Sequence, residues 1–151
     1  MQTMEIRTMT IDDYDEVYAL WLNTPGMGLN VLDDSKIGID KYLQRNPTTC
    51  FVAEKDNKIV GVLLSGHDGR RGFIYHTAVA LSERGKGIGR ALVDNAIVAL
   101  RAEGINKVAL VVIDGNETGN EFWEHLGFTK RNDLVYRNKV ITTLDMQAMN
   151  T

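Results

Sequence analysis

Three strand-like runs follow one another between residues 50 and 81, with no helical segment between them. They read CFVAEK (50–55), KIVGVLLSG (58–66) and FIYHTAVAL (73–81), and turn-forming residues separate them at 56–57 and 67–72. Strands joined by short turns are antiparallel neighbours, because a parallel neighbour needs a long crossover connection. This stretch therefore predicts the centre of a largely antiparallel sheet.

Helical periodicity occurs on both sides of this stretch. The residues before it predict a strand at 4–9 and helices near 11–23 and between Ser35 and Pro47; those after it predict a long helix near 86–103, an apolar strand at 108–113, a short helix near 117–126 and one or two strands within 128–144. The long helix links two strands as a crossover. The predicted fold class is α/β (α+β): a single domain over residues 1–151, with a mixed, largely antiparallel sheet of six to seven strands and about four helices.

Composition excludes several classes of protein. The 151 residues carry 17 Lys and Arg against 20 Asp and Glu, a formal net charge of −3, which disfavours nucleic-acid binding. No apolar run reaches the roughly 18 residues of a membrane span, and the N-terminal MQTMEIRTMT lacks the layout of a secretion signal. Cys50 is the only cysteine, so no intrachain disulfide can form, and we expect a cytoplasmic protein without a metal site.

The segment SERGKGIGR (82–90) departs most from ordinary patterning. It lies between a predicted strand and the long helix, and its glycines at 85, 87 and 89 permit backbone conformations that are closed to other residues. The first N–H groups of a helix have no partner within it and carry partial positive charge. Together with Arg84, Lys86 and Arg90, these amides predict a site for an anion such as phosphate.

The pattern R-x-x-G-x-G in this loop fits neither of two common phosphate motifs. A P-loop needs G-x-x-x-x-G-K-[ST], and a dinucleotide loop needs G-x-G-x-x-G, whose last position would be Arg90 or Leu92 here. One alternative interpretation is a tight strand–helix connection with solvated basic residues. Another is a nucleotide-binding regulatory domain.

Three segments in order resemble the GNAT superfamily of acetyltransferases. TAVALSERGKGIGRALVDNAI (77–97) is similar to the family's strand, pyrophosphate loop and helix; VALVVIDGN (108–116) is similar to its next strand with a terminal asparagine; and NEFWEHLGF (120–128) is similar to its "fYeklGF" segment. The resemblance implies a GNAT-type sheet in which the parallel strands 73–81 and 108–113 splay apart and hold acetyl-CoA as co-substrate.

The resemblance also implies which residues contact the co-substrate. Main-chain groups of Val79 and Leu81 would pair with the extended pantetheine arm, and Asn116 and Trp123 would lie beside it. Asn116 is equally suited to cap the 117–126 helix. The amides that would surround the pyrophosphate belong to Arg84, Gly85, Lys86, Gly87, Ile88, Gly89 and Arg90.

Acetyl transfer to an amine needs a group that accepts the amine proton and a donor for the oxyanion. By resemblance, the Val79 N–H would serve the oxyanion, and His76 would act as the base directly or through water, with Tyr75 facing the opposite side of the strand. The family's usual acid is a tyrosine at the position of Trp123, and an indole N–H does not ionise near neutral pH. The thiolate would then leave unaided, or take a proton from Tyr136 or from water.

The function that the resemblance implies is an acetyl-CoA-dependent N-acetyltransferase, in which a primary amine of a small molecule or protein attacks the thioester directly in a ternary complex. The alternative is an acyl-CoA-binding sensor or interaction module with little catalysis, which the tryptophan at position 123 favours. The acceptor stays open among small amines, amino acids, antibiotics and protein amines. The family commonly dimerises, and the terminal strands make a homodimer a candidate assembly.

Overall fold

Five strands form one sheet, and they lie side by side in the order in which they occur in the chain. The computed structural model describes residues 4–149. Its strands are β1 (Met4–Thr8), β2 (Phe51–Lys55), β3 (Lys58–His67), β4 (Gly72–Val79) and β5 (Val108–Ala109). The first four pair antiparallel, whereas β5 pairs parallel to β4. The predicted mixed, largely antiparallel sheet is confirmed.

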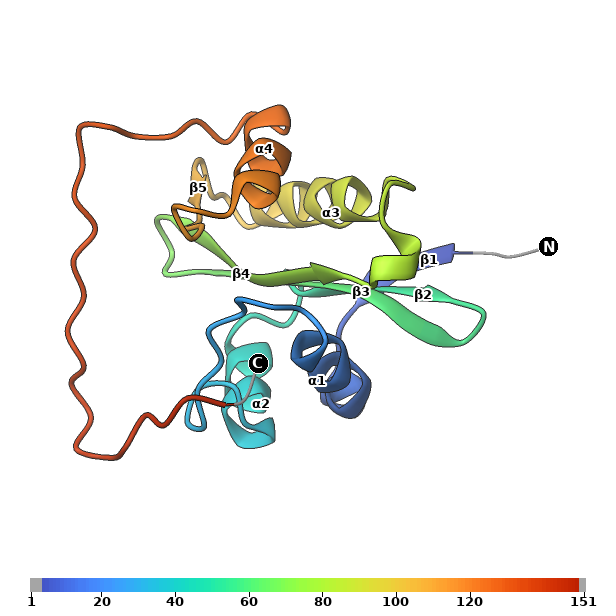
Figure 1. Ribbon diagram of the computed structural model, residues 1–151, viewed down its shortest axis with the longest axis horizontal. Helices are drawn as coiled ribbons and strands as arrows, with labels where there is room; N and C mark the ends of the chain where they lie inside the picture. The colour runs from blue at the N-terminus through green and yellow to red at the C-terminus, as the bar shows by residue number, and fades with distance from the viewer. Residues whose placement is uncertain (1–3, 150–151) are drawn as a thin grey trace.

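The helices cover both faces of the sheet (Figure 1). On one face lie α1 (Tyr14–Leu22) and α2 (Lys36–Arg45), and on the other lie α3 (Ile88–Ala102) and α4 (Glu117–His125). Short 3-10 turns are present at Ile11–Asp13 (η1) and Leu81–Glu83 (η2). Within residues 4–149, no helix is both long and apolar enough to cross a membrane. The α-helices lie where helical periodicity predicts them.

The long helix α3 carries a regular buried stripe. Ile88, Leu92, Ala96 and Leu100 are each at most 3% exposed and recur at helical spacing. The helix approaches the sheet closely at Gly61 of β3, where a Cβ atom would lie 3.1 Å from Leu92 Cδ1. This packing fixes α3 on the sheet, and so holds the start of α3 beside the end of β4.

Within residues 4–149 the sheet has five strands, so the predicted count of six to seven is wrong. Residues 129–147, here called the C-terminal arm, leave α4 as an extended segment that belongs to no strand of the described chain (Figure 1). The arm returns to the body at Val31, whose N–H donates to Gln147 O over 2.9 Å. The β-branched residues of the arm suit a strand, but a strand forms only where another backbone pairs with its polar groups. The strand that precedes the arm in the sequence, β5, is itself short, because its pairing with β4 ends at Ala109.

Cys50 lies immediately before β2 and is only 1% exposed. Its Sγ donates to the main-chain oxygen of Ser65 over 3.2 Å. Burial raises the pKa of the Cys50 thiol to about 12. Since the thiolate is the nucleophilic form of cysteine, the position and protonation of Cys50 indicate a role in packing.

We expect native Cys50 to resist alkylation by iodoacetamide at about pH 8, because the thiol is buried and remains protonated there. Intact-mass spectrometry measures the adduct over time. The same reaction in concentrated urea is the control, since unfolding exposes the thiol. Comparable labelling rates with and without urea would show that the site is open.

Leu92→Ala tests the packing that positions α3. Leu92 is fully buried, so we expect the free energy of unfolding to fall by about 2–5 kcal/mol through lost burial and a residual cavity. Urea denaturation measures the change. Val98→Ala on the same helix is the matched control, because Val98 is 62% exposed, and its effect should stay within about 0.5 kcal/mol. A similar loss in both variants would contradict the assigned buried stripe.

Candidate active site

The loop between β4 and α3 passes twice through the left-handed region of backbone conformation. Gly85 has φ = 78° and Gly87 has φ = 84°, and a Cβ atom at either position would meet no atom within 4 Å. The backbone conformation, rather than crowding, therefore requires glycine at both positions. At Gly89 the reason differs, since a Cβ there would lie 3.0 Å from Phe122 Cζ. This glycine lets α3 lie against α4.

The N–H groups of residues 85–90, here called the amide row, have no acceptor among the residues that the structure describes. The next amide is that of Ala91, which donates to Gly87 O over 3.0 Å, and no side chain caps the helix. Residues 84–87 are exposed. The first part of the amide row, residues 85–87, therefore meets solvent at the positive end of a 15-residue helix, an arrangement suited to binding an anion.

Basic side chains surround the amide row, and one carboxylate offsets part of their charge. Arg84 Nε donates to the last carbonyl of β4 over 3.1 Å, and Lys86 Nζ lies 3.3 Å from Glu83 Oε1. The same oxygen accepts a hydrogen bond of 2.7 Å from Lys55, which holds the pKa of Glu83 below its usual range. Glu83 stays ionised between Lys55 and Lys86 and offsets part of their positive charge. Because Arg84 and Arg90 add further positive charge, the net charge of the loop is positive.

The parallel strands β4 and β5 separate soon after they meet. Gly72 pairs with Val108 and Phe73 pairs with Ala109, and no further pair follows in the described chain. From residue 74 onward, no strand of the described chain pairs with the edge of β4 that faces β5, although the Val79 carbonyl accepts a hydrogen bond from Arg84 Nε. Such an edge offers main-chain donors and acceptors to an added extended segment. This is the splayed parallel pair that the family resemblance implies.

The strand β4 ends at Val79, so the predicted strand boundary at residue 81 is wrong. Val79 pairs with Gly61 of β3. Leu81 begins the η2 turn and is 79% exposed, and its carbonyl accepts the N–H of Arg84 over 3.4 Å. Any main-chain contact that Leu81 makes with a ligand would therefore come from a turn.

A β-bulge changes the direction of side chains in the middle of β4. The β3·β4 register shifts there, and His76 adopts φ = 41°, a left-handed value that is uncommon outside glycine. The Tyr75 ring lies 5.9 Å from that of Tyr42 in α2, and the His76 ring lies 5.2 Å from that of Trp21 in α1. Both side chains thus face the helices α1 and α2. The expectation that they face opposite sides is wrong, because the extra residue of a bulge interrupts strand alternation.

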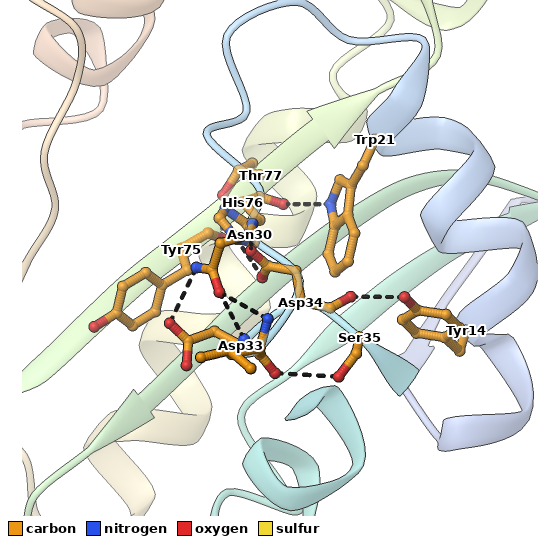
Figure 2. Close-up of polar contacts among 10 residues, drawn as sticks. Tyr14, Trp21, Asn30, Asp33, Asp34, Ser35, Tyr75, His76 and Thr77 are labelled. Carbon is orange, nitrogen blue, oxygen red and sulfur yellow. Dashed lines mark hydrogen bonds and ion pairs between the residues drawn. The ribbon is translucent and has the colours of Figure 1, made fainter. Parts of the chain in front are cut away.

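His76 belongs to a polar network that joins β4 to the loop before α2 (Figure 2). Its Nε2 lies 2.7 Å from Oδ1 of Asp34, whose side chain is 5% exposed. The other carboxylate oxygen accepts the Asn30 N–H over 2.9 Å, and the Asp34 carbonyl accepts the Tyr14 hydroxyl over 2.6 Å. On the opposite side of the histidine, Trp21 Nε1 donates to His76 O over 3.1 Å.

Sequence reasoning singles out His76 but does not connect it with Asp34, because 42 residues separate the two. The only local signal at Asp34 is the Asp33-Asp34-Ser35 run, in which Ser35 caps α2. Capping explains such a run without any contact to a strand. Within residues 4–149, no group of three or more His, Cys, Asp or Glu side chains is placed to hold a metal ion.

Asn116 and Trp123 lie on the face of the sheet that α3 and α4 cover. Asn116 caps α4, since its Oδ1 accepts the Gly119 N–H over 3.0 Å, which confirms one of its two predicted roles. The Trp123 ring lies between those of Phe122 and Phe128, at centroid distances of 4.9 and 5.1 Å. Because Phe122 abuts Gly89, this aromatic group lies beside the start of α3.

Tyr136 lies on the C-terminal arm and is 67% exposed. Burial raises the pKa of Tyr75 above its usual range. No hydrogen bond joins Tyr136 to His76 in the described chain. Its role as a proton donor stays a prediction.

Comparison with known proteins gives the same family that the sequence motifs resemble. The model of the acetyltransferase (GNAT) family matches residues 14–128. Acetyltransferase plu1384 of Photorhabdus laumondii subsp. laumondii is 34% identical over 144 residues, which cover 91% of this chain and 96% of that protein.

Two solved structures share the fold. The PaiA N-acetyltransferase from Thermoplasma acidophilum in complex with coenzyme A has a TM-score of 0.76 at 18% identity, covering 86% of this chain and 92% of that one. AAC(6')-Iy in complex with the bisubstrate analog CoA-S-monomethyl-acetylneamine has a TM-score of 0.72 at 19% identity, covering 92% and 99%. With the glycine loop before α3 and the parting of β4 from β5, these findings show that the chain belongs to the GNAT family of acetyltransferases.

Proposed function

We propose that this protein is an N-acetyltransferase that moves the acetyl group of acetyl-CoA to a primary amine of a small molecule or protein. The observation that carries the proposal is the amide row, which follows the open edge of β4 after the short η2 turn. Unpaired amides at a helix start suit a diphosphate, and an unpaired strand edge suits an extended amide-containing arm. Coenzyme A contains both chemical groups in one molecule.

The residues around the amide row fit this co-substrate. Gly85 and Gly87 place no side chain between the backbone and a ligand, and Arg84, Lys86 and Arg90 add charges that attract phosphate oxygens. At the end of β4, the Val79 N–H would donate to the acetyl oxygen. Leu81, Ile88, Gly89, Asn116 and Trp123 complete the proposed contacts.

The base in this proposal is His76. Acetyl-CoA supplies an acetyl group bound as a thioester, and an alkyl thiol has a pKa of about 8.5, so it leaves tolerably well as an anion. Trp123 in place of the family's tyrosine therefore does not prevent turnover. His76 would accept the amine proton through the ring nitrogen that is not bonded to Asp34.

Support for an amine acceptor comes from the names of structural neighbours. One is an aminoglycoside N-acetyltransferase, and another is a ribosomal-protein-alanine N-acetyltransferase from Brucella melitensis. Both names specify transfer to nitrogen, the first on a small molecule and the second on a protein. The proposal for this chain accordingly includes both kinds of amine.

The homodimer and the cytoplasmic location expected from the sequence stay predictions. The C-terminal arm exposes six large apolar side chains, and exposed apolar surface often marks a contact between proteins. They are Leu134, Val135, Tyr136, Val140, Ile141 and Leu144.

Gly87→Asp tests the amide row. The new carboxylate repels phosphate and competes for the free amides, as a side chain at a helix N-cap does. We expect isothermal titration calorimetry to show CoA affinity reduced by at least about tenfold, which corresponds to about 1.4 kcal/mol.

Gly104→Asp is the matched control for this substitution. Gly104 follows the other end of α3 with φ = 80°, and a Cβ there also meets no atom within 4 Å, so the backbone strain is alike. We expect this variant to bind CoA as the wild type does. Unchanged CoA affinity in Gly87→Asp would remove the amide row from the binding site.

His76→Asn tests the base. Asparagine tolerates the left-handed backbone at this position but cannot accept the amine proton, so we expect kcat to fall about 10²–10⁴-fold with CoA affinity unchanged. Thiol release from acetyl-CoA across a panel of amines measures the rate, and His67→Asn, at the last residue of β3, is the control.

Two results would contradict parts of this proposal. Full turnover in His76→Asn would leave His76 with a purely structural role. Tight CoA binding by the wild type without turnover of any amine would favour the alternative, an acyl-CoA-binding module with little catalysis.

A further inference from the structure

We propose that Asp34 is a positioning residue for His76. Its buried carboxylate determines which ring nitrogen of His76 carries the proton, and thereby keeps Nδ1 free to accept the proton of an amine. The proposal rests on the proposed N-acetyltransferase function, because an attacking amine is what gives the free nitrogen a role. It adds the loop before α2 to a site otherwise built from β4 and the start of α3.

Both oxygens of the Asp34 carboxylate are engaged in hydrogen bonds. Asp34 is 3% exposed, its Oδ1 lies 2.7 Å from His76 Nε2, and its Oδ2 accepts the Asn30 N–H over 2.9 Å. A carboxylate only accepts hydrogen bonds, so Nε2 is the donor and carries the hydrogen. The lone pair of the neutral ring then lies on Nδ1. In residues 4–149, Nδ1 has no hydrogen-bond partner.

The loop that carries Asp34 is held in place by several hydrogen bonds (Figure 2). The Tyr14 hydroxyl donates to Asp34 O over 2.6 Å, and Asn30 Oδ1 accepts the N–H of Asp33 over 2.8 Å. Directly after Asp34, Ser35 Oγ caps α2 by accepting an N–H of its first turn over 3.0 Å. These contacts keep the carboxylate in one position, as a residue that orients another must be kept.

Neighbouring residues also stabilise the backbone conformation of His76. Its φ of 41° is unfavourable for a residue with a Cβ, and such strain persists only where neighbouring contacts stabilise it. The indole of Trp21, which is fully buried, donates to the His76 carbonyl over 3.1 Å and lies edge-on to the imidazole ring. The ring is thus oriented from α1 on one side and from Asp34 on the other.

Asp34 is the carboxylate that contacts the imidazole in the described chain. The titratable side chains near the ring are Asp33, Asp34, Tyr14, Tyr42 and Tyr75. Asp33 bonds to the Asn30 side chain over 3.1 Å, and Tyr14 reaches only the Asp34 carbonyl. The Tyr75 ring lies 6.2 Å from that of His76. Asp34 is therefore the side chain whose contact can select the tautomer of the ring.

Proton transfer in the proposed site uses both ring nitrogens. Nδ1 takes the amine proton as the carbon–nitrogen bond forms and the carbon–sulfur bond breaks, and the bonding electrons leave on sulfur. The ring becomes an imidazolium whose Nε2–H remains on the Asp34 carboxylate, which stabilises the positive charge. The ring afterwards returns the proton to solvent.

Asp34→Asn tests this role with little change in shape. The Asn30 N–H can only donate, so it selects the oxygen of the new amide and turns the NH₂ group toward His76 Nε2. Nε2 must then accept, and the ring proton moves to Nδ1. This blocks the nitrogen that the proposed reaction uses, without removing the histidine.

We expect kcat of Asp34→Asn to fall about 10²–10⁴-fold, while the KM for the amine and the CoA affinity change by less than about threefold. Two-bond ¹H–¹⁵N spectra at about pH 9, where a free imidazole is neutral, should show the Nε2–H tautomer in the wild type and the Nδ1–H tautomer in the variant. The signals of His76 are assigned by their loss in His76→Asn. In a His76→Asn background, the second substitution should lower kcat by less than about threefold.

Asp33→Asn is the matched control. It removes the same charge from the neighbouring, exposed residue of the same loop, and it should leave both kcat and the His76 tautomer unchanged. An Nδ1–H tautomer in the wild type would overturn the proposal, and this measurement does not depend on whether Asp34→Asn folds. Two further results would overturn the proposal. One is a kcat of folded Asp34→Asn within about threefold of the wild type. The other is independent effects of Asp34→Asn and His76→Asn on kcat in the double variant.

The spectra separate this proposal from the proposed function. A wild type that acetylates no amine refutes the function, whereas the spectra still report whether Asp34 sets the tautomer. A wild type that turns over normally, with the same tautomer in Asp34→Asn, refutes the role of Asp34 alone.

Discussion

Main-chain donors without acceptors are the constraint on which the proposed function depends. In a folded protein nearly every amide has a partner, yet in the described residues 4–149 two neighbouring sets of amides lack an acceptor: those on the β5-facing edge of β4 beyond Phe73 and the amide row before Ala91. The packing of α3 on Gly61 of β3 keeps the second set at the end of the first. A ligand that carries both an extended amide chain and a diphosphate satisfies both sets at once, which is why the proposed co-substrate follows from the backbone before any side chain is considered.

The bulge in β4 determines which side chains this strand presents to α1 and α2. A regular strand would send Tyr75 and His76 to opposite faces, but the extra residue turns both toward α1 and α2. There the imidazole meets the buried Asp34 carboxylate and the indole of Trp21. The main-chain groups proposed to bind the co-substrate and the proposed base thus come from the same strand, the former at its edge and the latter on its face.

Much of the fold could be predicted because local patterns in the sequence specify its helices and strands. Apolar spacing in α3, the uninterrupted strand runs of β2 to β4 and the glycines at 85 and 87 all act through nearby residues. The prediction was wrong where strand pairing is decisive: the C-terminal arm has the composition of strands, but it pairs with no strand in the described chain and its backbone is hydrogen-bonded to the body only at Val31. It was also wrong about Tyr75, because strand alternation holds only while the register is regular.

The sequence by itself determined the order of the helices and of strands β1 to β5 and carried the family resemblance, and it predicted an anion site at the loop before α3, since each of these depends on residues within one or two elements. The tertiary structure alone decided where β4 and β5 part, how the bulge turns His76, and that Asp34, 42 residues earlier, meets its ring. The physical reason is that pairing, register and burial are properties of segments distant in sequence. Their geometry exists only after the chain has packed.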